Sequence, residues 1–99
     1  MARFDVYRQS RGPGYLLDCQ ADVLGRLNTR IVVPLLPSDE GPPPIAQLNP
    51  VFRIGEEEVI LYTQFAASVP ARELESRVAS LAGEDRRIMN ALDMLLTGY

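Results

Sequence analysis

Glycine and proline divide the first seventy residues of this chain into short runs, and this division constrains the fold more than any other feature. The clusters lie at 10–14 (SRGPG), 37–44 (PSDEGPPP) and 48–50 (LNP). Glycine reaches backbone conformations that turns require and proline cannot donate a backbone hydrogen bond, so such clusters end regular elements. The apolar runs between them are too short for typical helices. The sequence therefore predicts a domain made mostly of short β-strands joined by turns.

Five of these runs have the composition of strands, with β-branched or alternating apolar residues. They are residues 3–8, 15–20, 30–36, 51–54 and 58–63. The first two flank a short turn and predict one hairpin, and the last two flank Gly55 and predict another. Pro34 lies inside the third run, which places that strand at a sheet edge or gives it a bulge or a bend. Residues 65–70 fit no element clearly.

The last third of the chain has helical patterns. Residues 72–81 combine good helix formers with apolar spacing, which predicts a helix from propensity alone. A second helix is expected over about 84–96 and is ended by Gly98, because glycine adopts the positive φ of helix C-caps. Met94 and Thr97 lie on the side of this helix that faces away from the core. The face that covers the core is predicted from helical spacing: Ile88, Ala91, Leu92 and Leu95.

These elements predict an α+β fold, in which a strongly bent antiparallel sheet or small barrel carries a C-terminal helix packed over it. The 99 residues are expected to form a single domain, 1–99. No apolar run approaches the roughly 20 residues that span a bilayer, and the first residues lack the apolar region of a secretory signal. We therefore expect no membrane association and a cytoplasmic location.

The composition argues against several kinds of active site. The chain has no histidine and no lysine, and its ten cations are all arginine. It therefore lacks the usual general base, the commonest metal ligand and the lysine of phosphate-binding loops. The single cysteine, Cys19, lies in an apolar run and is expected in the core. A net charge of −3 argues against direct nucleic-acid binding. We expect no enzyme activity, no cofactor and no metal.

The charged residues offer only weak candidates for chemistry. Residues 56–58 are three consecutive glutamates at an expected hairpin tip, where like charges favour solvent over a metal site. Asp18 and Asp22 could pair for acid–base work, but the sequence supplies neither a perturbing environment nor a partner base. Arg86 and Arg87 are expected on a solvated helix face. None of these residues specifies an enzyme.

Several short motifs occur in order along nearly the whole chain. The two most specific are Arg30-x-Val32-x-Pro34-Leu35 and Ala67-Ser68-Val69-Pro70. The others are Phe4-x-Val6-Tyr7, Gln20-x-Asp22 followed by Val23 and Leu24, Pro50-Val51, Ile54-Gly55 followed by an acid, and the final helix with its penultimate Gly98. In these motifs the chain resembles the CcdB family of toxins. The resemblance implies a small SH3-like β-barrel with a C-terminal helix, and it favours strand and loop over 72–81.

The resemblance also implies a function. CcdB toxins are homodimers and not enzymes, and they bind the A subunit of DNA gyrase, where they trap the covalent gyrase–DNA cleavage complex. A partly disordered antitoxin, CcdA, wraps the dimer and can extract it from gyrase. Carried over by position, the gyrase contacts in this chain are Val23, Leu24, Asp93, Leu96, Thr97, Gly98 and Tyr99.

The end of the chain departs from the family pattern. Asp93 replaces an asparagine, Leu96 an aromatic residue, Thr97 a tryptophan and Tyr99 an aliphatic residue, whereas Gly98 is kept. An exposed tryptophan can be an interface hot spot of roughly 2 kcal/mol or more.

Two alternatives therefore stand beside a gyrase poison. One is a divergent protein of CcdB fold that no longer poisons gyrase and binds another partner or only its antitoxin. The other is an endoribonuclease, because MazF and Kid toxins share this fold. The missing histidine, the net negative charge and the scattered arginines count against the second.

Overall fold

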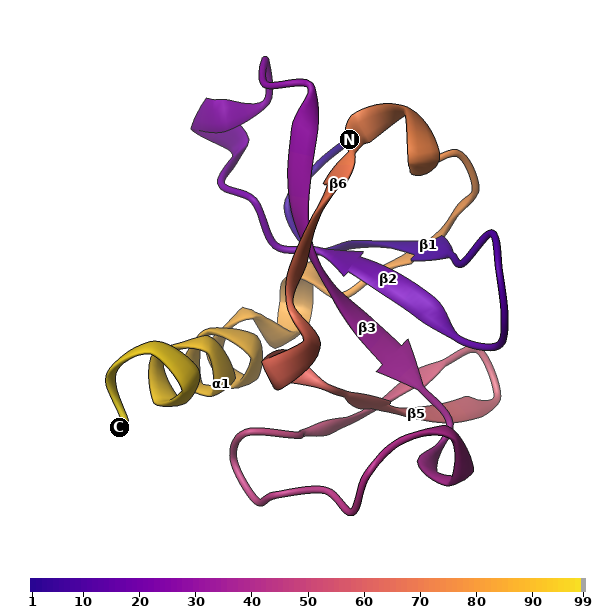
Figure 1. The fold of residues 1–99 in the computed structure, drawn as a ribbon, viewed down its shortest axis with the longest axis vertical. Helices are drawn as coiled ribbons and strands as arrows, with labels where there is room; N and C mark the ends of the chain where they lie inside the picture. Colours follow the sequence, from indigo (N-terminus) through magenta and orange to yellow (C-terminus); the bar gives the residue numbers. More distant parts are fainter. Residues whose placement is uncertain (99) are drawn as a thin grey trace.

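A computed structural model of the chain describes residues 1–98, and within them one antiparallel sheet of seven strands curls into a half-barrel beside a C-terminal helix (Figure 1). The strands are β1 (Asp5–Arg8), β2 (Tyr15–Asp18), β3 (Thr29–Leu36), β4 (Val51–Ile54), β5 (Glu57–Leu61), β6 (Ala67–Pro70) and β7 (Arg77–Ser80). The helix is α1 (Asp85–Thr97), and five short 3₁₀ turns are η1 (Asp22–Leu24), η2 (Ser38–Glu40), η3 (Thr63–Phe65), η4 (Ala71–Glu73) and η5 (Ala82–Glu84). The predicted α+β class is confirmed.

Strand β3 organises the sheet, because it pairs with three other strands. One of its edges pairs with β2, while the other pairs first with β6, over residues 29–32, and then with β5, over Leu35 and Leu36. Pro34 lies between these two partners, and its carbonyl accepts the backbone N–H of Tyr62 at 3.0 Å. The missing N–H of Pro34 therefore falls where β3 changes partner. Of the alternatives predicted for Pro34, the edge position is wrong, because β3 has partners on both sides, and the strand changes partner at this proline instead.

Both predicted hairpins are confirmed. Strands β1 and β2 pair with Val6 opposite Leu17. Strands β4 and β5 pair with Ile54 opposite Glu57, and Gly55 in the turn between them has φ +63°. The segment that fitted no element clearly contains η3 and β6.

The helix predicted over 72–81 from propensity is wrong, and the strand and loop favoured by the resemblance are right. Residues Arg77–Ser80 form β7, which pairs with the outer edge of β1. Leu74 is buried against Tyr7 and Val32 in a second, smaller core. The open edge of β1 and this apolar pocket outweigh a local preference worth only tenths of a kcal/mol per residue.

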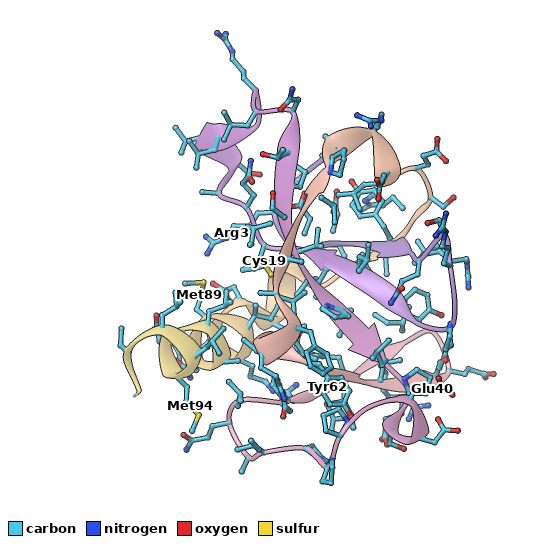
Figure 2. All side chains as sticks on the ribbon, viewed as in Figure 1. Arg3, Cys19, Glu40, Tyr62, Met89 and Met94 are labelled. Carbon is cyan, nitrogen blue, oxygen red and sulfur yellow. The ribbon has the colours of Figure 1, made fainter. Side chains whose placement is uncertain are left out.

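Helix α1 covers the main core with its first turns only. Ile88 and Ala91 are fully buried, and Met89 and Leu92 pack partly against the same core. Leu95, predicted on the core face, is 39% exposed, because the end of the helix extends beyond the sheet (Figure 1). Met94, expected to face away from the core, is half-buried (Figure 2). No helix within residues 1–98 is long and apolar enough to cross a membrane.

Candidate partner-binding surface

The end of α1 carries four of the predicted contacts among the described residues. Leu96 is 77% exposed, and Asp93, Thr97 and Gly98 are exposed beside it. Gly98 closes the helix in the left-handed conformation, at φ +84°, and its N–H donates to the carbonyl of Met94 at 3.0 Å. This cap fixes the direction in which the chain leaves the helix. Tyr99, the last predicted contact, lies outside the described residues.

The hydroxyl of Thr97 is engaged within the helix. Its Oγ1 donates to the backbone carbonyl of Asp93 at 2.6 Å, so the hydroxyl proton is already used in a hydrogen bond within the helix. The methyl group of Thr97 is then the part of this side chain left for contact with a partner, and it offers much less area than an indole.

The other predicted contacts lie on η1 and the loop around it. Val23 is 87% exposed, and Leu24 and the following Leu27 are also exposed, although all three are large and apolar. None of the residues in η1 is buried. Exposed apolar side chains gathered on one short segment are typical of an interaction surface. Leu27 was missed at the sequence level, where its apolar character in an exposed loop was the available signal.

Buried polar groups beneath η1 hold this loop in place. The guanidinium of Arg30 donates to Oδ2 of Asp18 through Nε at 3.0 Å and Nη2 at 2.6 Å, and both side chains are fully buried. The side chain of Gln20 reaches both η1 and β3. At the far end of η1, Oδ1 of Asp22 accepts the backbone N–H of Arg3 at 2.8 Å. The loop is therefore a supported structure rather than a loose connection.

Helix α1 and the η1 loop are separate projections from the half-barrel. Both extend toward the left in Figure 1, the loop above and the helix below. Arg3 connects the underlying elements, because its Nη2 lies 2.7 Å from the sulfur of Met89 on α1 while its backbone holds Asp22 (Figure 2). Within one chain the predicted contacts thus form two patches, one on the η1 loop and one at the end of α1, and both project from the same half-barrel.

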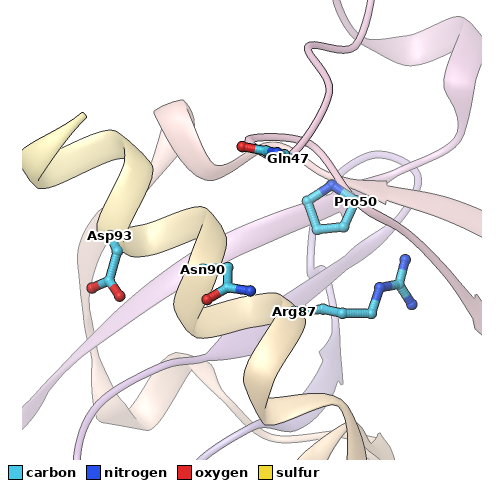
Figure 3. Close-up of a pocket in the computed structure, with 5 residues that line it drawn as sticks. All are labelled: Gln47, Pro50, Arg87, Asn90 and Asp93. Atoms are coloured by element: carbon cyan, nitrogen blue, oxygen red, sulfur yellow. The ribbon is translucent and has the colours of Figure 1, made fainter. Parts of the chain in front are cut away.

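A groove of about 550 Å³ runs beside the helix patch (Figure 3). It is lined by Gln47 and Pro50 from the loop before β4 and by Arg87, Asn90 and Asp93 from α1. Arg87 was expected on a solvated face, but its Nη2 donates to the carbonyl of Val51 at 2.6 Å and its guanidinium lies 4.4 Å from the ring centroid of Phe52. Asn90, one helical turn before Asp93, was not singled out from the sequence.

The residues considered for acid–base work are engaged in structural contacts. Asp18 binds Arg30 and Asp22 binds the backbone of Arg3, so each carboxylate has a structural partner of its own. Cys19 is buried as predicted, and burial raises the pKa of its thiol to about 12, which suppresses the reactive thiolate. Glu57 accepts the hydroxyl of Tyr15. No group of three acidic or cysteine side chains within residues 1–98 is placed to hold a metal ion.

The described surface thus displays apolar side chains on a supported loop and at a capped helix end. Some of the motif residues that indicated a family support these features: Arg30 and Gln20 lie beneath the loop, and Gly98 forms the helix cap. Another, Pro34, lies at the change of partner in β3. A family model described as CcdB protein matches residues 3–98, which is nearly the whole chain. This chain therefore belongs to the CcdB family, the family of toxins from toxin–antitoxin systems.

Proposed function

We propose that this protein is the toxin of a type II toxin–antitoxin system and that it binds the A subunit of DNA gyrase and traps the gyrase–DNA cleavage complex. The observation that supports this most is the exposure of Leu96 at a helix end that extends beyond the core. An apolar side chain held there contributes nothing to the core and is available to a partner. The proposed contacts are Val23, Leu24, Asp93, Leu96, Thr97 and Gly98, with Tyr99 from the sequence.

The two apolar patches supply the affinity in this proposal. Burying a large aliphatic side chain that was fully exposed is worth about 1.5–3 kcal/mol. Val23 and Leu96 are both mostly exposed in the free chain, so both would gain most of that amount in a dry interface. Interfaces typically depend on a few such anchors.

The partners follow from the same proposal. The toxin acts as a homodimer in the cytoplasm, and a CcdA-like antitoxin binds the dimer and releases it from gyrase. Exposed aliphatic and aromatic side chains outside the proposed gyrase contacts, such as Ile31, Phe65 and Val78, are available for these contacts. The protein reaches DNA only through gyrase, in keeping with its net charge of −3.

A gyrase assay with the purified full chain tests the proposal. The wild type should inhibit supercoiling and increase cleaved DNA in the presence of gyrase, and Leu96→Ala should weaken both effects about tenfold or more. The matched control is Ile45→Ala, an exposed aliphatic residue in the loop before β4 that is assigned neither to the gyrase contacts nor to the dimer or antitoxin contacts. Normal supercoiling and no cleaved DNA at a large excess of wild-type toxin would disprove the proposal.

The second candidate is a CcdB-fold protein that has lost gyrase poisoning and binds another partner or only its antitoxin. It is favoured by Thr97, whose small side chain is tied to the helix, and by the exposed carboxylate of Asp93. Growth of cells that express the protein, together with retained antitoxin binding, would support this candidate. Killing that is abolished by gyrase-resistance mutations would rule it out.

A further inference from the structure

Gln20 is a buried polar residue whose side chain connects the η1 loop to β3. It is only 7% exposed. Its Oε1 accepts the backbone N–H of Ile31 at 3.1 Å, and its Nε2 donates to the backbone carbonyl of Leu24 at 3.0 Å. One amide therefore satisfies a donor on the strand and an acceptor at the end of the turn.

The η1 turn has few other means of keeping its shape. Its own backbone bonds are local, with Leu24 donating to Ala21, Gly25 to Asp22 and Leu27 to Leu24. Beyond the contact from Gln20, its tertiary hydrogen bond is the one that Asp22 accepts from the backbone of Arg3, at the opposite end of the turn from Leu24. No residue of the turn is buried, so apolar packing does not anchor it. A single exposed 3₁₀ turn is only marginally stable without tertiary contacts. The contact from Gln20 to Leu24 is therefore a principal restraint on the conformation of the turn.

Gln20 is itself fixed by the buried ion pair beneath it. The backbone N–H of Gln20 donates to Oδ1 of Asp18 at 3.1 Å, and Oδ2 of the same carboxylate binds Arg30. This chain of contacts leads from the core of the half-barrel to the carbonyl of Leu24. Val23 is the middle residue of η1, next to Leu24, and its side chain is exposed.

We propose that Gln20 is a positioning residue for partner binding, which holds η1 in the conformation that presents Val23. This inference rests on the proposed function, because the partner in question is the gyrase A subunit. Gln20 itself is buried and makes no contact with that partner. Loss of its side chain should loosen the turn and weaken binding only through Val23 and its immediate neighbours.

The test is a double-mutant cycle with full-length gyrase A subunit as the binding partner. Gln20→Ala should weaken affinity about tenfold in the wild-type background and less than twofold in a background that carries both Val23→Ala and Leu24→Ala, because the contacts it positions are then absent. Asn49→Ala is the matched control. Asn49 is also a buried amide with two backbone partners, accepting from Ile45 at 2.9 Å and donating to Leu61 at 3.0 Å, but it supports a different loop. Its effect should be the same in both backgrounds.

Amide hydrogen exchange in the free protein tests the positioning role without a partner. The amides of Leu24, Gly25 and Leu27 should exchange faster in Gln20→Ala and stay unchanged in Asn49→Ala. Circular dichroism checks that each variant folds. If Gln20→Ala does not fold, Gln20→Glu takes its place, because a glutamate keeps the acceptor for Ile31 and loses the donor to Leu24.

The outcomes separate this inference from the proposed function. If the wild type binds the gyrase A subunit and Gln20→Ala is equally harmful in both backgrounds, or exchange in the turn is unchanged, the positioning role is wrong. If the wild type does not bind, the gyrase assignment fails. Exchange then decides alone: faster exchange confined to the turn supports positioning, and unchanged exchange overturns it.

Discussion

Thr97 is the residue at which this chain differs most from what its family membership implies. The side chain is exposed, but its hydroxyl is bound to the carbonyl of Asp93 and its methyl group is small. The small surface area of the methyl group therefore limits the contact that this position can make with a partner. The position itself is well prepared for a larger group, because the Gly98 cap fixes the helix end next to it.

Thr97→Trp should strengthen binding to the gyrase A subunit by about tenfold or more, because an exposed indole supplies the area of an interface hot spot. The substitution removes one exposed hydrogen bond, so the free energy of unfolding should change by less than about 0.5 kcal/mol. Titration calorimetry and urea denaturation measure the two effects. Ser10→Trp, at an exposed position in the turn between β1 and β2 on the opposite side of the molecule from the helix end (Figure 1), controls for nonspecific adhesion of an added indole. Unchanged affinity would mean that the interface has diverged at more than this residue.

The buried pair of Asp18 and Arg30 is the residue-scale feature with the largest expected effect on stability. Asp18→Ala should lower the free energy of unfolding by roughly 3–5 kcal/mol, because it leaves the Arg30 guanidinium buried without its partner. Urea denaturation measures this loss. Asp22→Ala, which removes an exposed contact to a backbone N–H, should cost less than about 1 kcal/mol. Equal losses in the two variants would contradict the assigned importance of the buried pair.

At the scale of elements, the first five strands and the two hairpins could be predicted from the sequence, whereas the pairings between strands distant in the chain could not. Alternation and turns located β1 to β5 to within about two residues. The failure over 72–81 shows the limit, because β7 forms only when the distant edge of β1 is available to it. The site has the same division. Val23 was named only through the family resemblance, and the support from Gln20 joins segments that only the folded chain brings together.

Arg87 connects α1 to β4, and this contact was also hidden in the sequence. Arg87→Ala should lower the free energy of unfolding by about 1–2 kcal/mol, through loss of the bond to Val51 and of the stacking on Phe52. Arg86→Ala is the matched control, because the adjacent arginine is exposed and makes neither contact. Thermal unfolding followed by circular dichroism compares them. If Arg86→Ala is as destabilising as Arg87→Ala, the helix is held by general charge rather than by this contact.

At the scale of the whole molecule, one side-chain contact links the two strands on either side of β3. The hydroxyl of Tyr15 on β2 donates to Oε1 of Glu57 on β5 at 2.7 Å, although 42 positions separate them. The three glutamates at 56–58 looked alike in the sequence as a solvated turn. Folding distinguishes Glu57, because it is the first residue of β5 and faces the Tyr15 hydroxyl.

This contact makes stability depend on pH in the alkaline range. The hydrogen bond to Glu57, followed by burial, raises the pKa of Tyr15 above its usual 10.0. Because the folded chain holds this proton more tightly than the unfolded chain, the stabilisation is complete below about pH 10 and is lost as the pH rises through the raised pKa.

At pH 8, Tyr15→Phe should lower the free energy of unfolding by roughly 1–2 kcal/mol. Urea denaturation at pH 8 and pH 11 should then show the wild type and this variant converging. Glu57→Gln should converge with the wild type in the same way, whereas Glu58→Gln, at the exposed neighbouring position, should keep the wild-type profile. Parallel profiles for wild type and Tyr15→Phe would mean that the contact between β2 and β5 does not stabilise the fold.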